Sequence, residues 1–439
     1  IAAVVNVITR KRFDGAEASV YVGQYGKGDG DTTTYSFTLG SEGERGGVTL
    51  AAEYSKQDPV WAKDRWFSRD GNAGPNYPGS GASPINQKGG FCDPCVTPDL
   101  KKGEPGYIGP NDQRWYTLRD GGDPTKRGDY RLETSADAVN ANEQMMVQTG
   151  IERKSLYVNG NYDFTDSIAF NADVIYNERT TNQQIAGYPY QSASFDTPLS
   201  KDSAFNPTDQ DLTFRRRLWE MPRTTESKLK TLRFAPSVSG FFEFAGRTFD
   251  WDVGALWNRN ESTKTGHGDM SLIASRQALG ASFVGADGVA RCGTSMADPL
   301  ATSNCRPWNP LLPYGVAGNG SLSDPAAQAF LFPYFTDTGL TKTTSFTANL
   351  SGSIVTLPAG DLGFAVGVEH RKEEGRFSPD AFAQSGESTG LGKQTTQGDY
   401  SLDEVYLELN VPVLADMPFA KELTLNAATR YSDYSNFGN

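Results

Sequence analysis

Histidine and cysteine are scarce in this sequence, and long hydrophobic runs are missing from it. Two histidines and four cysteines among 439 residues argue against a histidine-rich metal site and against histidine-dependent catalysis. No run of 18 or more apolar residues occurs, so no transmembrane helix is expected. A membrane β-barrel is not excluded, because its strands are hydrophobic only at alternate positions. Lysine and arginine number 41 against 53 acidic residues, and a net charge of −12 offers no basic field to hold nucleic acid.

Alternation of apolar and polar residues is the commonest pattern along the chain. Between residues 155 and 164 the apolar side chains occupy the even positions, and the alternation resumes after the turn at 165–167. Each such segment has one apolar face and one polar face, as a β-strand between two different surroundings requires. We predict strands near 15–25, 32–40, 46–57, 150–164, 167–180, 228–244, 247–260, 342–356, 361–376, 399–413 and 421–435.

The connections between these segments alternate between very short and very long. Short turns are expected at about 40–47, 165–167, 245–247 and 357–361. Long polar segments are expected at about 58–148, 180–227, 261–341 and 377–398. Such long connections are uncommon in compact soluble domains, whereas outer-membrane barrels have short turns on one rim and long loops on the other. Aromatic residues near the strand ends suit the two membrane interfaces (Tyr54, Tyr162, Phe164, Phe244, Phe249, Trp257, Tyr431).

The pattern therefore predicts an all-β fold, a transmembrane antiparallel β-barrel. A large secreted β-sandwich or a sugar-acting enzyme would also show alternation. In that case the apolar faces would be buried in a core and the loops would be shorter on average.

Several motifs along the chain, from Val4–Lys11 near its start to Arg430–Ser435 near its end, together resemble the family of TonB-dependent outer-membrane receptors. The segment Val4–Lys11 resembles the last strand of that family's plug domain, and Phe13–Glu17 resembles the start of its first barrel strand. Further similar segments are spread along the chain (Tyr21–Gly26, Ala51–Trp61, Val368–Arg371, Phe377–Asp380, Glu404–Pro412, Arg430–Ser435). The resemblance implies that residues 1–12 end a plug and that residues 13–439 form the N-terminal half of a 22-stranded barrel. On this view eleven strands are half of the barrel, and most of the plug, the TonB box and the terminal strand are expected outside this chain.

The resemblance also implies a function. Such a receptor captures a scarce nutrient, such as a siderophore–iron complex or an oligosaccharide, and imports it when TonB and its inner-membrane energising complex move the plug. The implied partners are TonB, outer-membrane lipid and the ligand, with no cofactor and no enzymatic activity. Polar residues on the inward faces are expected to touch the plug or line the lumen (Glu53, Asn159, Asn171, Asp173, Arg430). A passive porin, or less favourably a secreted glycan-active protein, remains an alternative.

The four cysteines form two pairs along the sequence. Cys92 and Cys95 have the spacing of a redox motif, but they lie in a loop rich in glycine and proline. In a protein that the resemblance places outside the cell, we expect a structural disulfide there and a second one between Cys292 and Cys305. No zinc site is predicted, because neither pair has a second pair or a histidine at ligand spacing.

The long loops carry the one positive signal for ligand binding. Five of the seven tryptophans lie in or beside them, together with several tyrosines and arginines. Exposed aromatic rings beside charged groups suit a site in which the rings stack on a sugar or the site binds a siderophore. The loops could instead use these rings to pack on one another. The candidate binding residues are Trp61, Arg65, Trp66, Trp115, Tyr116, Trp219, Trp308 and Tyr314.

Overall fold

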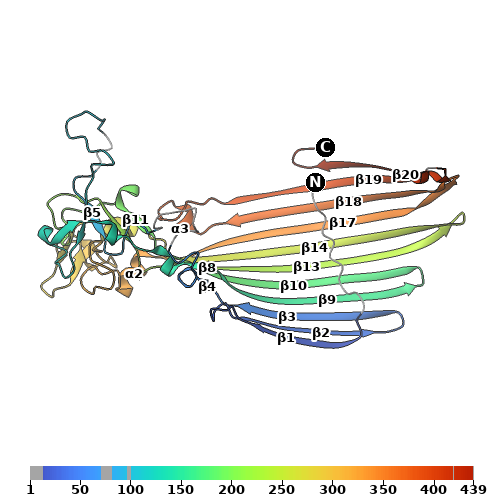
Figure 1. The fold of residues 1–439 in the computed structure, drawn as a ribbon, viewed down its shortest axis with the longest axis horizontal. Coiled ribbons are helices and arrows are strands. Elements are labelled where there is room, and N and C mark those ends of the chain that lie inside the picture. The colour runs from blue at the N-terminus through green and yellow to red at the C-terminus, as the bar shows by residue number, and fades with distance from the viewer. Residues whose placement is uncertain (1–12, 71–81, 96–99, 419, 439) are drawn as a thin grey trace.

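The computed structural model describes residues 13–70, 82–95, 100–418 and 420–438. The expected plug segment 1–12 lies outside these residues. Within them, eleven long strands form one antiparallel sheet, here called the large sheet, and each strand pairs with its neighbours in chain order (Figure 1). These strands are β1 (Gly15–Gly23), β2 (Thr32–Glu42), β3 (Gly46–Gln57), β9 (Gly150–Thr165), β10 (Ile168–Ile185), β13 (Arg223–Phe244), β14 (Arg247–His267), β17 (Phe335–Leu357), β18 (Gly360–Ser378), β19 (Thr396–Met417) and β20 (Ala420–Tyr434).

The predicted number and order of strands are confirmed, but several strands are longer than expected. β13 begins at Arg223 rather than near 228, β14 continues to His267, and β17 begins at Phe335 rather than near 342. These extensions are polar, so hydrophobic alternation does not mark them. The extensions remain paired as β-strands because the hydrogen bonds of a β-ladder join backbone groups and do not depend on the side chains.

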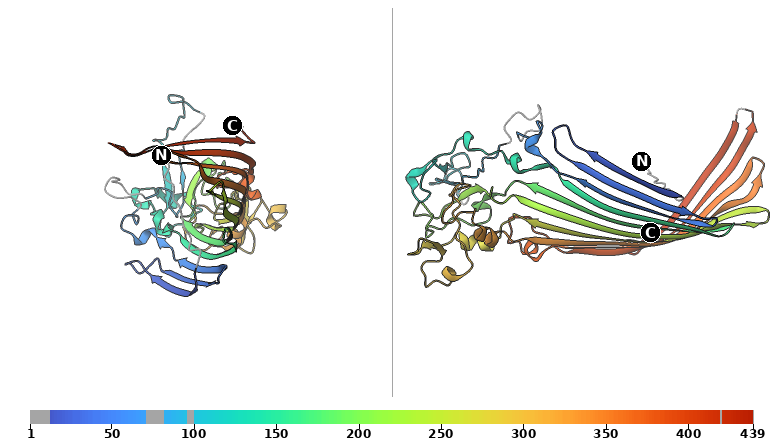
Figure 2. Two further views of the ribbon diagram at one scale, coloured as in Figure 1. Left: turned by 90° about the vertical axis from the view of Figure 1, so that its right-hand side faces the viewer. Right: turned by 90° about the horizontal axis from the view of Figure 1, so that it is seen from below.

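The large sheet is curved into an open trough, with β1 along one edge and β20 along the other (Figure 2). Its short turns lie at one end, and the long loops gather at the opposite end. The turn between β13 and β14 has two residues, Ala245 and Gly246, with φ angles of 52° and 72°. Positive φ at both central positions gives the turn a twist that matches the twist of paired strands.

Register places the predicted apolar residues on one face of the large sheet. Cross-strand partners include Leu50 with Val158, Val238 with Val253, and Val405 with Tyr431. Two rows of aromatic rings border this apolar face. The row nearer the long loops is Tyr35, Tyr54, Tyr176, Phe234, Trp257, Phe346 and Tyr431, and the row nearer the short turns is Tyr162, Phe164, Phe170, Phe242, Phe244, Phe249 and Phe364.

The opposite face of the large sheet is polar and hydrogen-bonded across the strands. It carries the inward residues expected from the sequence. The amide of Asn159 donates to Asn171 and to Asp173, both at 2.9 Å, and Asn159 is fully buried. Arg430 lies 3.5 Å from Glu404. This close packing of side chains is expected on the concave side of a curved sheet.

The long connections fold into a compact domain at one end of the sheet, here called the cap. It consists of loop A (58–70, 82–95 and 100–149), loop B (186–222) and loop C (268–334). Loop D (379–395) is hydrogen-bonded to loop C through Thr389 and Met270. The strands of the cap are β4 (Val60–Trp61), β5 (Gly90–Cys92), β6 (Trp115–Leu118), β7 (Tyr130–Leu132), β8 (Met146–Gln148), β11 (Pro189–Gln191), β12 (Phe214–Arg217), β15 (Ser282–Val284) and β16 (Ala290–Cys292). Its helices are α1 (Leu272–Ala278), α2 (Pro325–Leu331) and α3 (Ala381–Gln384), with 3₁₀ turns at 62–64, 127–129, 135–137, 141–144, 192–194 and 299–302.

Helices play a minor part in the molecule. Over the residues that the structure describes, no helix is long and apolar enough to cross a membrane.

Candidate ligand-binding site in the cap

A small sheet joins loops A and B. Its strand order is β11-β12-β5-β6-β7, so two strands from loop B pair with three from loop A. Phe214 of β12 lies opposite Phe91 of β5, and Tyr190 of β11 lies opposite Arg216. Because β-ladder hydrogen bonds cross from one loop to the other, the two loops hold a fixed arrangement.

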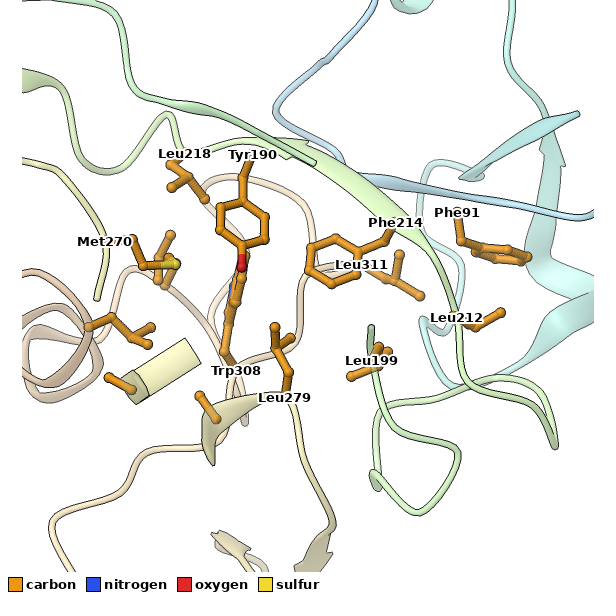
Figure 3. Close-up of a cluster of buried hydrophobic side chains, with 14 of the residues drawn as sticks. Phe91, Tyr190, Leu199, Leu212, Phe214, Leu218, Met270, Leu279, Trp308 and Leu311 are labelled. Atoms are coloured by element: carbon orange, nitrogen blue, oxygen red, sulfur yellow. The ribbon is translucent and has the colours of Figure 1, made fainter. Parts of the chain in front are cut away.

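Loop C completes the core of the cap with Trp308 (Figure 3). The ring of Trp308 lies edge-on to Tyr190 and Phe214, with centroids 5.7 and 5.5 Å away, and it is fully buried. The prediction that Trp308 contacts a ligand is therefore wrong. This ring supports the alternative that loop aromatics pack on one another, since core packing leaves no face of the ring for a ligand.

A buried ion pair lies beside this core. The guanidinium of Arg216 donates to Glu220, and both side chains are almost completely buried. Burial lowers the pKa of Arg216, because it removes the charged form from water, while Glu220 opposes that shift. The neighbouring Arg217 donates to two backbone carbonyls and to Ser83 of loop A, so it also joins the loops.

Both expected disulfides are present. Cys92 is bonded to Cys95 at the end of β5, and Cys292 of β16 is bonded to Cys305 in loop C. Each closes a short stretch of a single loop, which fits a structural role.

Two of the candidate aromatic residues are paired with arginines. The guanidinium of Arg215 lies 4.1 Å from the ring centroid of Trp115 and also pairs with Glu133. The guanidinium of Arg127 lies 4.1 Å from the ring centroid of Tyr116. Cation–π contacts of this kind occupy one face of each ring, so a ligand could stack only on the other. Burial raises the pKa of the Glu133 carboxyl, and Arg215 opposes that shift.

Arg65 links loop A to the connection between β1 and β2. Its two terminal nitrogens donate to Asp29 at 2.9 and 2.7 Å, which fixes the β1–β2 connection to loop A. These hydrogen bonds hold the pKa of Asp29 below its usual range. Trp61 lies nearby as the last residue of β4, with the ammonium of Lys63 5.9 Å from its ring centroid. Arg65 therefore has a structural partner in Asp29.

The remaining candidates differ in exposure. Trp66 is 76% exposed and lies edge-on to Phe67, and Tyr314 is 48% exposed. Trp219 is half-buried, and its carbonyl accepts a hydrogen bond from Gln144. Tyr334, which is not among the candidates, is 69% exposed and stacks on His267 with ring centroids 3.9 Å apart.

The cap thus presents a few exposed rings on a rigid support. In the described parts of the chain, no group of three or more histidine, cysteine, aspartate or glutamate residues is placed to hold a metal ion. Aromatic rings with polar neighbours suit recognition by stacking and hydrogen bonding.

No protein-family model and no curated protein sequence matches the chain. Among solved structures, it is similar to the siderophore receptor PiuA of Acinetobacter baumannii (12% identity, TM-score 0.34, covering 91% of this chain and 46% of that one). It is also similar to the ferric-catecholate import receptor Fiu of E. coli K12 (12% identity, TM-score 0.34, covering 99% of this chain and 57% of that one). A third match is the outer-membrane ferripyoverdine receptor of Pseudomonas aeruginosa (10% identity, TM-score 0.31, covering 97% of this chain and 54% of that one). The chain spans about half the length of these structures.

Proposed function

We propose that residues 13–439 form part of the wall of an outer-membrane β-barrel of the TonB-dependent receptor kind, with residues 1–12 ending its plug. The barrel takes up a scarce nutrient, captured at the cap and released into the lumen when TonB moves the plug. The work is binding and conformational change, so no bond in the nutrient is made or broken.

The observation that carries this proposal is the exposed apolar face of the large sheet. Side chains such as Phe37, Val253, Val405 and Leu425 are between 42% and 57% exposed although they are apolar. Water-soluble proteins rarely expose continuous apolar patches larger than a few hundred Å². A face that runs across every strand of the large sheet therefore favours lipid as its surroundings. It also counts against the glycan-active alternative, in which this face would be buried.

The width of the apolar face fits a membrane. Eight positions along β14 separate Phe249 in one aromatic row from Trp257 in the other. At about 3.4 Å per residue this is about 27 Å along the strand, or about 21 Å for a strand tilted by about 40°. The apolar band of outer-membrane barrels is about 25 Å tall.

The limit of the apolar face also runs obliquely across the strands. On β9 the first charged outward residue is Lys154, which lies opposite Glu178 of β10. On β19 it is Asp403, which lies opposite His370 in the row that contains Phe346. The boundary between apolar and charged outward residues therefore lies further towards the long loops on β9 than on β19. Tilted strands in a barrel predict this shift, because the membrane plane cuts them at different ladder rows.

Uptake by cells tests the function. We would delete the complete gene and follow labelled ferric siderophores and oligosaccharides, with and without TonB. Loss of one substrate's uptake, reproduced when TonB is removed, would support the proposal and identify the substrate. Uptake that does not depend on TonB would favour a passive channel instead.

A pair of variants tests the cap as the capture site. Trp66→Ala removes an exposed ring and is expected to weaken ligand binding, whereas Trp66→Phe retains an aromatic face and should bind nearly as the parent does. Equal binding by both variants and the parent would remove Trp66 from the site.

A further inference from the structure

We propose that the polar face of the large sheet carries a binding site for an oligosaccharide that is uncharged along most of its length and acidic at one end. The site consists of an uncharged cavity across β13, β14, β17, β18 and β19, and of a pair of arginines, Arg153 and Arg179, beside it on β9 and β10. The inference rests on the proposed function, in which this face lines the lumen, and it names the substrate class.

The cavity lies on the polar face, near the ends of the strands that lead into the cap. It has a volume of about 570 Å³ and is lined by two consecutive rungs of the sheet, a rung being a set of directly opposite cross-strand partners. One rung contains Asn260, Thr341 and Gly375. The other runs from β13 to β18 through Leu229, Ser262, Gly339 and Phe377.

No ionisable side chain from these two rungs faces the cavity on β13 to β19. Arg376 borders the cavity, but the alternation along β18 directs its side chain to the outward face, where it donates to Ser378 at 2.9 Å. The room in the cavity has a simple origin. Gly375 and Gly398 are direct partners, and no atom lies within 4 Å of the place that a Cβ would take at either of them.

The groups around the cavity are those that bind sugars. The hydroxyl of Thr231 donates to Asn260 at 2.7 Å, and the amide of Asn260 donates to Thr341 at 3.0 Å, so this row of polar side chains is held in place. Phe377 adds an aromatic ring that is 38% exposed. Sugar hydroxyls exchange hydrogen bonds with amides and hydroxyls, and the apolar face of a sugar ring stacks on an aromatic ring.

The rungs on either side of the cavity carry charges. The next rung away from the cap contains Arg233 and Glu373. In the next rung towards the cap, Lys264 lies opposite Asp337. A charged group of a ligand would lose water in the uncharged cavity without gaining a partner there. The part of the ligand that fills the cavity is therefore uncharged.

Positive charge lies at one end of the cavity. Arg179 is directly opposite Leu229, and Arg153 is directly opposite Arg179. Like charges in that arrangement destabilise a sheet. Among the residues that the structure describes, neither guanidinium has a hydrogen-bond or ion-pair partner. The other neighbour of Arg153 in this rung is Ser55, and Glu53 lies one rung deeper on β3.

A carboxylate suits this pair of arginines. Its two oxygens can accept charge-assisted hydrogen bonds from both guanidiniums, which would remove the repulsion between them. From Phe377 on β18 to Arg179 on β10 the rung crosses four strand spacings, or about 19 Å. A free carboxylate would occupy only the arginine end. A compact metal chelate with its charge gathered around the metal would not match an extended site that is charged at one end, whereas an oligosaccharide with one acidic sugar does.

Direct binding to the full chain encoded by the gene, purified in detergent, tests the site by titration calorimetry. The acidic probes are aldotetraouronic acid and sialyl-lacto-N-tetraose, and their neutral counterparts are xylotetraose and lacto-N-tetraose. Ferric enterobactin is the siderophore probe. We expect at least one acidic probe to bind about tenfold more tightly than its neutral counterpart, as the loss of a hydrogen bond to a charged group predicts.

Variants of the arginine pair test the acidic end. Arg153→Gln/Arg179→Gln should remove the preference for the acidic probe and leave binding of the neutral one unchanged. Lys154→Gln/Lys228→Gln makes the same change of charge on the outward face of β9 and β13, so it should bind as the parent does.

Variants of the cavity test the uncharged part. Asn260→Ala and Phe377→Ala should weaken binding of acidic and neutral probes alike. Asn258→Ala removes the same amide one rung deeper on the same strand and should have no effect. Phe377→Tyr keeps the ring and should bind nearly as the parent does.

Each other outcome overturns a defined part of the inference. Binding of neither acidic probe, or equal binding by the arginine variant and the parent, would overturn the site. Tighter binding of ferric enterobactin that the arginine variant loses would reassign the arginines to a compact anion. Failure of the parent to insert into lipid vesicles would overturn the proposed function as well, whereas insertion without selective binding would overturn this inference alone.

Discussion

A charge placed in the centre of the apolar face should reveal whether lipid covers it. Val253 lies halfway between Phe249 and Trp257 on β14, opposite Val238 and Ala348, and is 44% exposed. The substitution Val253→Arg removes no buried contact that a water-soluble protein would need. In water it should change the free energy of unfolding by less than about 0.5 kcal/mol, as is usual for surface positions.

In a membrane the same substitution is costly. Arginine at the bilayer midplane destabilises outer-membrane barrels by about 2–4 kcal/mol, which corresponds to about 30-fold to 900-fold in the folding equilibrium. The cost falls to about 0–1 kcal/mol near the interfaces. Thr344→Arg, at the level of the aromatic row, should therefore cost much less than Val253→Arg. Thr347→Arg, on the polar face, controls for any general effect of a new arginine.

The assay is guanidinium unfolding of the protein in phospholipid vesicles, followed by tryptophan fluorescence. The expected order of destabilisation is Val253→Arg well above Thr344→Arg, with Thr347→Arg lowest. If all three variants unfolded within about 0.5 kcal/mol of the parent, the apolar face would not be in lipid and the barrel proposal would fail.

Three further predictions concern the cap. Trp308→Ala should destabilise it by about 3–5 kcal/mol, seen as faster proteolysis of the loops, because it leaves a large cavity in the core. Cys305→Ser opens a disulfide that spans 13 positions and should cost the cap about 3 kcal/mol in thermal unfolding. Hydrogen bonds from Arg131 hold the pKa of Asp137 well below its usual range, so the stability from this pair is present above the unfolded-state pKa of about 3.9 and is lost as the pH falls towards the folded-state pKa. Unfolding of the cap between pH 5 and pH 2 should show this loss, and Asp137→Asn should show a smaller one.

The sequence predicted the large sheet well because every outward position meets the same surroundings. A strand with an apolar face on one side and polar groups on the other repeats the same requirement every two residues, so the pattern from Leu156 to Phe164 can be recognised in that segment alone. It predicted the ends of the strands less well. Beyond the apolar band both faces are polar, and residues such as Thr225 and Thr338 give no contrast from which to read a strand.

The cap could not be predicted from the same signal. Its core comes from three loops, and the apolar residues of each loop are too few and too irregularly spaced to form a recognisable face. Trp308 therefore looked like an exposed binding residue. Its burial depends on Tyr190 and Phe214, which belong to another loop, and only the folded arrangement brings the three rings together.

The shared core limits how far the loops of the cap can move separately. If loops A, B and C had separate cores, each could move alone. Phe91, Phe214 and Trp308 come one from each loop and belong to the same buried cluster, so moving one loop would expose rings that the other two cover. Exposing that much apolar surface is costly, because each aromatic residue buries roughly 150–250 Å². The exposed rings of Trp66 and Tyr314 therefore lie on a surface whose shape the whole cap sets.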